Sequence, residues 1–392
     1  MQRITASNNK LRLGFVGGGV DSWIGPVHRY AANLDGNFDV IAGVFSRDAT
    51  RNQLAAKNFG IEPARVYSNY VDMARAEAAR SDGIQAVSIM TPNATHAAIA
   101  RVFIDAGIAV ICDKPLASRL DDAVALAAQC AEKRALFILT FNYSGYPMVR
   151  EARERIAAGE IGTVRVVQVQ HAASSGVDPV EMQGSKSMVW RTDPQEVGDS
   201  AVLADVGVHA HHLARFVTGL EVSEVSAELS TMVPGRASDD NAHLMLRFNS
   251  GARGTLWASF IAAGNRHGLR IQVIGSTGSL IWDQEHPDQL LICPQHGPHI
   301  TLRRGEAWLS QASLLSTRTK CGQPEGFLEA FANIYSDAAE LIRARCEQRL
   351  PDQRSGLAPG IVDGLRGMEL IDAAVRSQRS AGAWTTVREV TI

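Results

Sequence analysis

Short apolar runs alternate with helical patterns over the first 141 residues of the chain, and this alternation constrains the fold more than any other feature. The runs are Leu11–Val16, Phe38–Phe45, Ile84–Met90, Ile108–Cys112 and Leu136–Phe141. Between them, apolar residues recur at the spacing of one helix face. Strands that alternate with helices of this length predict a doubly wound parallel sheet covered by helices on both faces.

The pattern changes in the second half of the chain, where strand-like alternation dominates from Val164 to Cys293. Asn249-Ser250-Gly251 and Ser276-Thr277-Gly278 are typical of tight turns between successive strands, which indicate an antiparallel sheet. Helical patterns return at Phe327–Arg345 and Gly360–Arg379. We therefore expect an α/β nucleotide-binding domain over residues 1–142 and an α+β domain over residues 143–392, whose open sheet is mainly antiparallel.

The composition excludes several classes of protein. The 392 residues are 45% hydrophobic and 20% charged with a net charge of -2, which gives no reason to expect a nucleic acid or a membrane surface as partner. No apolar run approaches the roughly 20 residues of a membrane span. The polar start of the chain does not resemble a signal peptide, and the five cysteines lack metal-ligand spacing, so we expect a cytoplasmic protein with reduced thiols.

A glycine-rich turn, Gly17-Gly18-Gly19, joins the first expected strand to the first expected helix. The pyrophosphate of a dinucleotide binds at such a junction, because the turn lets it reach the amide groups at the helix N-terminus. Gly17 permits the tight turn, and Gly19 lets the backbone approach the phosphates. Ser22 occupies the usual place of the third glycine, and we infer that Gly25 replaces it after a three-residue insertion. The turn predicts NAD or NADP as cofactor.

The residues after the second expected strand bear on the choice between the two cofactors. An acidic residue there binds the ribose hydroxyls of NAD, whereas an arginine accepts the 2′-phosphate of NADP. This chain has Ser46-Arg47, which favours NADP, followed by Asp48. We interpret Asp48 as the N-cap of the next helix, with a ribose contact as the alternative.

The tripeptide Asp113-Lys114-Pro115 ends the buried run Ile108–Cys112. A lysine is costly to bury, and open α/β sheets bind ligands at the carboxyl ends of their strands. The alternative is a solvated lysine at an ordinary strand exit. The surrounding strand–helix alternation favours a site, so Lys114 is a candidate catalytic residue.

Asp205 and His209 are four residues apart in a helical pattern, which places carboxylate and imidazole on one face. A carboxylate beside a histidine stabilises its protonated form, which suits removal of a proton from a hydroxyl group. A structural pair that caps the helix is the alternative. A metal site of His209, His211 and His212 is not expected, because this spacing does not converge on one face.

Several motifs occur together and in a fixed order: Gly25-Pro26-Val27-His28, Thr91-Pro92-Asn93 with His96, Asp113-Lys114-Pro115, Asp205 with His209, and Gly275-Ser276-Thr277-Gly278-Ser279. In this order they resemble the Gfo/Idh/MocA family of glucose–fructose oxidoreductase and inositol dehydrogenase relatives. The resemblance implies a Rossmann domain and NAD(P)-linked oxidation of a sugar or polyol hydroxyl. It also implies a homodimer or homotetramer formed through the open sheet of the second domain.

The resemblance also suggests functions for single residues. Lys114 matches the family's catalytic lysine, which usually follows a glutamate where this chain has Asp113, and Asp205 and His209 match its Asp and His pair. Asn93 would contact the cofactor near the nicotinamide, and Thr91 and His96 belong to the same cofactor motif. Three more residues resemble substrate-side positions, with core packing or a surface charge as the alternative: Tyr143, Trp190 and Arg191.

The expected reaction is hydride transfer between a sugar or cyclic polyol hydroxyl and nicotinamide. His209 would act as the general base, oriented by Asp205, while Lys114 would stabilise the oxygen or take the proton itself. Two other functions remain open at this point: a non-catalytic NAD(P)-binding sensor with the same fold, and a metal-dependent sugar isomerase.

Overall fold

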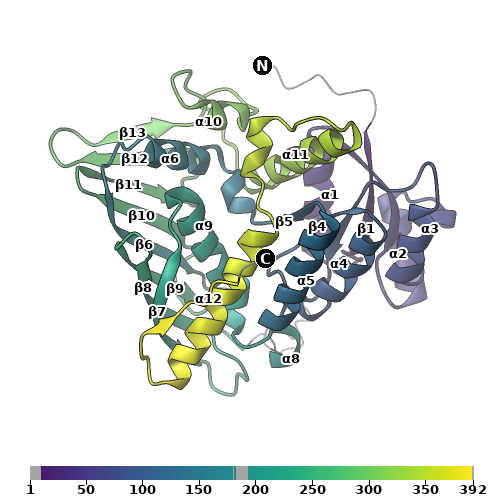
Figure 1. The fold of residues 1–392 in the computed structure, drawn as a ribbon, viewed down its shortest axis with the longest axis horizontal. Helices are drawn as coiled ribbons and strands as arrows, with labels where there is room; N and C mark the ends of the chain where they lie inside the picture. Colours follow the sequence, from purple (N-terminus) through teal and green to yellow (C-terminus); the bar gives the residue numbers. More distant parts are fainter. Residues whose placement is uncertain (1–9, 180, 182–192, 391–392) are drawn as a thin grey trace.

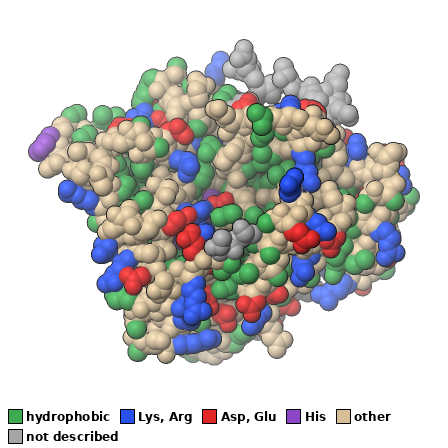
Figure 2. Space-filling model, in the orientation of Figure 1, with side chains coloured by type: hydrophobic (Ala, Val, Ile, Leu, Met, Phe, Trp, Pro, Cys, Tyr) green, Lys and Arg blue, Asp and Glu red, His purple; other side chains and the backbone are tan. Residues whose placement is uncertain are grey.

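The computed structural model describes residues 10–179, 181 and 193–390. Two sheets lie side by side, one of five strands and one of nine (Figure 1). Trp190 and Arg191 lie outside the described residues. No described helix combines the length and the apolar character needed to span a bilayer. Figure 2 shows acidic and basic side chains interspersed over one face of the molecule rather than segregated by sign.

The five-stranded sheet is parallel, with the strand order β2-β1-β3-β4-β5. Its strands are β1 (Leu11–Gly17), β2 (Phe38–Val44), β3 (Ala86–Met90), β4 (Ala109–Cys112) and β5 (Phe137–Leu139). Its helices are α1 (Ile24–Leu34), α2 (Ala49–Phe59), α3 (Tyr70–Ala78), α4 (His96–Asp105) and α5 (Leu120–Lys133). The expected parallel sheet is therefore confirmed. The strand order reverses between β1 and β3, and a reversal of this kind opens a crevice at the carboxyl ends of the strands.

The nine-stranded sheet has the order β13-β12-β11-β10-β6-β9-β8-β7-β14. Its strands are β6 (Val164–Ala172), β7 (Val222–Ser230), β8 (Asn241–Phe248), β9 (Arg253–Ser259), β10 (Leu269–Gly275), β11 (Gly278–Asp283), β12 (Gln289–Pro294), β13 (Ile300–Arg303) and β14 (Thr385–Thr386). All neighbouring strands are antiparallel except β6 and β9, which are parallel. The expectation of a mainly antiparallel sheet is confirmed.

The helices of the second half connect the two sheets. They are α6 (Pro147–Ala157), α8 (Pro194–Val197), α9 (Val208–Thr218), α10 (Gln311–Leu315), α11 (Phe327–Cys346) and α12 (Ile361–Arg379). Helix α9 packs on β6 and β10, and α12 packs on β7 and also against α5 (Figure 1). Helix α11 returns to α1, and its Phe331 and Ile334 share an apolar core with Leu13 and Phe15 of β1.

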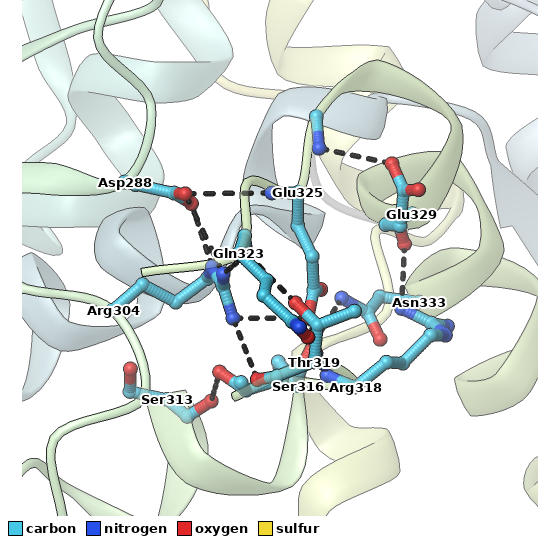
Figure 3. A network of polar contacts seen from close by, with 12 residues as sticks. Asp288, Arg304, Ser313, Ser316, Arg318, Thr319, Gln323, Glu325, Glu329 and Asn333 are labelled. Carbon is cyan, nitrogen blue, oxygen red and sulfur yellow. Dashed lines mark hydrogen bonds and ion pairs between the residues drawn. The ribbon is translucent and has the colours of Figure 1, made fainter. Parts of the chain in front are cut away.

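A network of buried charges fixes the segment that leads into α11 (Figure 3). The guanidinium group of Arg304, at the end of β13, donates to Asp288 at 2.6 Å and to Glu325 at 3.0 Å. The same oxygen of Glu325 accepts from the backbone amides of Arg318 at 2.6 Å and Thr319 at 2.5 Å. Through these bonds the buried pair of Arg304 and Glu325 ties Arg318 and Thr319 to the start of α11.

Candidate active site

A cavity of about 490 Å³ lies at the carboxyl ends of the parallel strands, where the two halves of the chain meet. The first half contributes Asp21–Ile24, which follow the glycine turn, and residues from the ends of β3, β4 and β5. The second half contributes the end of β6, the segment before α9, the loop before β10 and the start of α11. The cavity therefore occupies the place where open α/β sheets bind their ligands.

Lys114 lies two residues beyond the end of β4 and lines the cavity. Its Nζ donates to Oδ1 of Asp205 at 2.5 Å and to the backbone carbonyl oxygen of Asp205 at 2.6 Å. The peptide bond between Lys114 and Pro115 is cis. Both side chains of the Lys114–Asp205 pair are largely buried. A carboxylate from the second half of the chain thus compensates the lysine charge.

Asp205 lies in a single π-helical turn, Leu203–Gly207, and His209 lies in the first turn of α9. The structure thus has a widened turn where the sequence suggested a regular helix, and both residues line the cavity. The Nδ1 atom of His209 is buried without a hydrogen-bond partner among the described residues. Burial, followed by the nearby charge of Lys114, lowers the pKa of His209 well below its ordinary value. The neutral imidazole is therefore able to accept a proton.

Two further histidines lie beside His209, and neither was predicted from the sequence. His171 lies near the end of β6, and His267 lies two residues before β10. Their ring centroids are 4.5 Å apart, and those of His171 and His209 are 5.9 Å apart. Tyr143, which is buried, packs edge-on against His209 at 4.7 Å and shares a 2.6 Å hydrogen bond with Nε2 of His267. The position of His171 near the end of an alternating strand was a signal, whereas the loop around His267 had none.

Asp113 fixes the strand end from which Lys114 projects. Its Oδ1 accepts hydrogen bonds from Oγ1 of Thr140 at 2.7 Å and from the backbone amide of Lys114 at 3.0 Å. Its Oδ2 lies 4.0 Å from Nε2 of the fully buried His28, whose Nδ1 lies 2.7 Å from the Tyr335 hydroxyl. Burial lowers the pKa of His28 to about 4, so the histidine is neutral near pH 7.

The glycine turn forms a cradle that only glycine fits. Gly17 has a φ of 89°, and a Cβ atom there would lie 2.6 Å from the carbonyl oxygen of Met90. A Cβ atom on Gly19 would lie 2.7 Å from the Phe45 carbonyl oxygen. A Cβ atom on Gly25, the second residue of α1, would likewise lie too close to the turn, 2.4 Å from the Gly18 carbonyl oxygen. A glycine turn that leads into a helix N-terminus is the arrangement that binds a pyrophosphate group.

The other residues expected at a cofactor site are distributed between the cavity and its surroundings. Thr91 and Asn93 line the cavity. His96 lies behind it, with its ring nitrogens 2.8 Å from the carbonyl oxygens of Thr91 and Pro115. His96 therefore joins the segment after β3 to the segment after β4.

The residues that follow β2 bear on the cofactor site. Asp48 accepts a hydrogen bond from the backbone amide of Arg51 at 2.8 Å and caps α2, so its interpretation as the N-cap is confirmed. Ser46 precedes it, with Oγ accepting from the amide of Asp48 at 3.1 Å, and Arg47 is exposed.

His211 and His212, which follow His209, do not line this cavity. The ring of His212 stacks on Phe141 with the centroids 4.3 Å apart, and burial lowers the pKa of His212 to about 4 and that of His211 to about 3. Within the described part of the chain, no group of three or more His, Cys, Asp or Glu side chains is arranged to hold a metal ion.

The chain is similar to known proteins over nearly its whole length. An uncharacterized oxidoreductase of Bacillus subtilis, YfiI, is 34% identical over 377 residues, which cover 95% of this chain and 96% of that protein. The structure of an inositol dehydrogenase homolog from Azotobacter vinelandii complexed with NAD⁺ has a TM-score of 0.92 at 37% identity, covering 97% of this chain and 98% of that chain. A structure with the same description, complexed with NADH and myo-inositol, has a TM-score of 0.89 at 35% identity and the same coverage.

Two family descriptions match the two halves. Residues 11–141 match the oxidoreductase family with an NAD-binding Rossmann fold, and residues 149–281 match the GFO/IDH/MocA C-terminal domain. The motifs from the glycine turn to Asp205 and His209 lie within these two matched segments. The chain belongs to the GFO/IDH/MocA family of oxidoreductases.

Proposed function

We propose that this protein is a dehydrogenase that transfers a hydride between a hydroxyl-bearing carbon of a sugar or cyclic polyol and a nicotinamide dinucleotide. One observation carries the proposal. Lys114, from the dinucleotide-type sheet, and Asp205 and His209, from the second half of the chain, line a single cavity together with Asp21–Ile24, which follow the glycine turn. This arrangement sets a hydrogen-bond donor and a neutral base opposite the place of a nicotinamide ring.

The geometry suggests a distinct task for each side chain. His209, kept neutral by burial, takes the proton of the substrate hydroxyl as the carbon gives up its hydride. Lys114 donates a hydrogen bond to the same oxygen and stabilises its developing negative charge. Asp205 holds the Lys114 ammonium group in place through the 2.5 Å contact. The nicotinamide, when bound, supplies the hydride acceptor.

A substrate with several hydroxyl groups fits the polar end of the cavity. His171, His267 and Tyr143 converge there with His209, and imidazole and phenol groups both donate and accept hydrogen bonds. The Azotobacter homolog, whose structure contains NADH and myo-inositol, belongs to the same family. We infer that this chain acts on an inositol, an anhydrosugar or a glycoside.

The end of β2 supports a preference for NADP. Arg47 is exposed beside Ser46, while the neighbouring carboxylate of Asp48 is engaged in capping α2. A guanidinium group without a competing acidic residue suits a 2′-phosphate. If this is correct, Arg47→Ala raises the KM for NADP and leaves the KM for NAD nearly unchanged. A wild-type enzyme that strongly prefers NAD would contradict the assignment.

The nine-stranded sheet supports a homodimer or homotetramer. Helices α9 and α12 pack on the sheet, and along β8 the side chains of Ala242, Leu244 and Leu246 are buried while His243 and Met245 between them are exposed. We propose that a second copy of the chain covers the exposed face. Sedimentation of the wild type and of Met245→Lys would test this, since a charge at the contact weakens it.

The decisive experiment is a panel of inositols, monosaccharides, anhydrosugars and glycosides assayed separately with NAD and NADP. Formation of reduced nicotinamide with at least one member is the expected result. If the protein binds a dinucleotide but reduces it with no polyol or sugar, the proposed activity is wrong.

A further inference from the structure

Trp23 is an unusual residue for the position it occupies. It is the last residue of the lengthened glycine turn, directly before α1, and it lines the cavity. Its side chain is nonetheless 65% exposed, although an indole ring gains by being removed from water. Such a ring at the edge of a ligand cavity offers an apolar face to whatever fills the cavity.

Trp23 packs against Phe327, an aromatic neighbour among the described residues, with ring centroids 5.8 Å apart. Phe327 is the first residue of α11 and also lines the cavity. It follows the buried network of Arg304 and Glu325 (Figure 3), and the Gly326 amide donates to Glu329 at 2.9 Å. Phe327 therefore lies between two bonded residues, Glu325 before it and Glu329 after it.

Phe327 contacts both Trp23 and Tyr143. Its ring lies 6.5 Å from that of Tyr143, which in turn packs against His209. Ring contacts thus lead from Trp23, the residue directly before α1, through Phe327 and Tyr143 to His209. A pyrophosphate bound at the N-terminus of α1 would lie next to Trp23, whereas a sugar beside His209 would lie next to Tyr143.

We propose that Trp23 is a cofactor-binding residue that covers the pyrophosphate and the adjoining ribose of the dinucleotide, with Phe327 as its fixed support. The proposal rests on the dinucleotide of the proposed function. The indole has two means of binding: its flat face excludes water from the ribose, and its N–H is able to donate to a phosphate oxygen. The exposed indole is buried when the dinucleotide occupies the cavity.

The test is a calorimetric titration of the wild type, Trp23→Ala and Trp23→Phe with NADH and with NADPH. We expect Trp23→Ala to weaken binding of the preferred dinucleotide about tenfold, as for the loss of one well-covered aromatic side chain. Trp23→Phe keeps part of the apolar face, so its Kd for the dinucleotide should lie between that of the wild type and that of Trp23→Ala. Trp308→Ala is the matched control, because Trp308 is 57% exposed and does not line the cavity.

The outcomes separate this inference from the proposed function. If the wild type binds neither dinucleotide, both the proposed function and the proposed role of Trp23 are wrong. If the wild type binds one and Trp23→Ala binds it equally well, only the inference is overturned. A Trp23→Ala variant with a raised KM for the polyol and an unchanged dinucleotide Kd would also overturn it, since Trp23 would then contact the substrate. Unfolding midpoints without dinucleotide should match, because the side chain is exposed.

Discussion

The Nζ atom of Lys114 lies 2.5 Å from the Oδ1 atom of Asp205, although the two residues are 91 positions apart in the sequence. One follows a strand of the parallel sheet, and the other lies in the π-helical turn that leads into α9. Their contact spans the cavity between the two halves of the chain. It links the expected cofactor side of the cavity to the expected substrate side.

Replacing Lys114 with Ala should remove activity without removing the binding site. The variant loses the donor to the substrate oxygen, and loss of one such donor lowers kcat about 10²- to 10³-fold. Dinucleotide binding, measured by calorimetry, should change little, because the glycine cradle is untouched. Lys133→Ala, at the exposed end of α5, is the control and should keep full activity. A Lys114→Ala enzyme that turns over normally would show that the assignment is wrong.

Asp205→Asn should act through Lys114. The amide keeps the size of the side chain but loses the charge that holds the ammonium group, so kcat falls. Since the two groups act as a unit, the double variant should be little worse than Lys114→Ala alone. Steady-state kinetics of the four enzymes measure this coupling. Effects on kcat/KM that simply multiply would mean that the two residues act independently.

The buried histidines predict a loss of stability in acid. Burial lowers the pKa of His28 and His212 to about 4 and that of His211 to about 3, from an ordinary value of 6.5. Below pH 6.5 the unfolded chain therefore binds more protons than the folded one, and the free energy of unfolding falls as the pH decreases toward 4. Each histidine contributes a slope of about 1.4 kcal/mol per pH unit in this range.

Urea unfolding at several pH values between 7.5 and 4.5 measures this slope. His211→Gln should flatten it, whatever its effect on stability at pH 7.5. His296→Gln, an exposed histidine, is the control and should leave the slope unchanged. A stability that does not depend on pH over this range would contradict the neutral, buried state of these groups.

Arg304→Met should destabilise the fold strongly. The guanidinium group is buried against Glu325 and Asp288, and its removal leaves the carboxylate of Glu325 buried without its cation. Losses of this kind cost about 3–5 kcal/mol in the free energy of unfolding, measured by denaturant titration. The neighbouring Arg303 is exposed, so Arg303→Met should change stability by less than about 0.5 kcal/mol. Equal effects of the two substitutions would contradict the proposed importance of the network.

Much of the fold was predictable because its signals are local. The apolar runs that start at Leu11 and Phe38 begin β1 and β2 at those residues, and Asp48 marks the start of α2 as expected. The short edge strands β13 and β14 were missed. β13 has four residues, of which only Leu302 is buried, and β14 has two, so both are too short for a period-2 pattern to stand out. The domain boundary near residue 142 stays a prediction.

The sequence by itself determined the kind of protein: strand and helix periods predict the two sheets, and short motifs identify the glycine turn, Lys114, Asp205 and His209. Only the tertiary structure decided how these residues meet, and it added His171, His267 and the contact of Trp23 with Phe327. The physical reason is that periodicity and capping act over a few residues. A contact across 91 positions depends instead on tertiary packing, in which α9 packs on β6 and β10 and α12 joins β7 to α5.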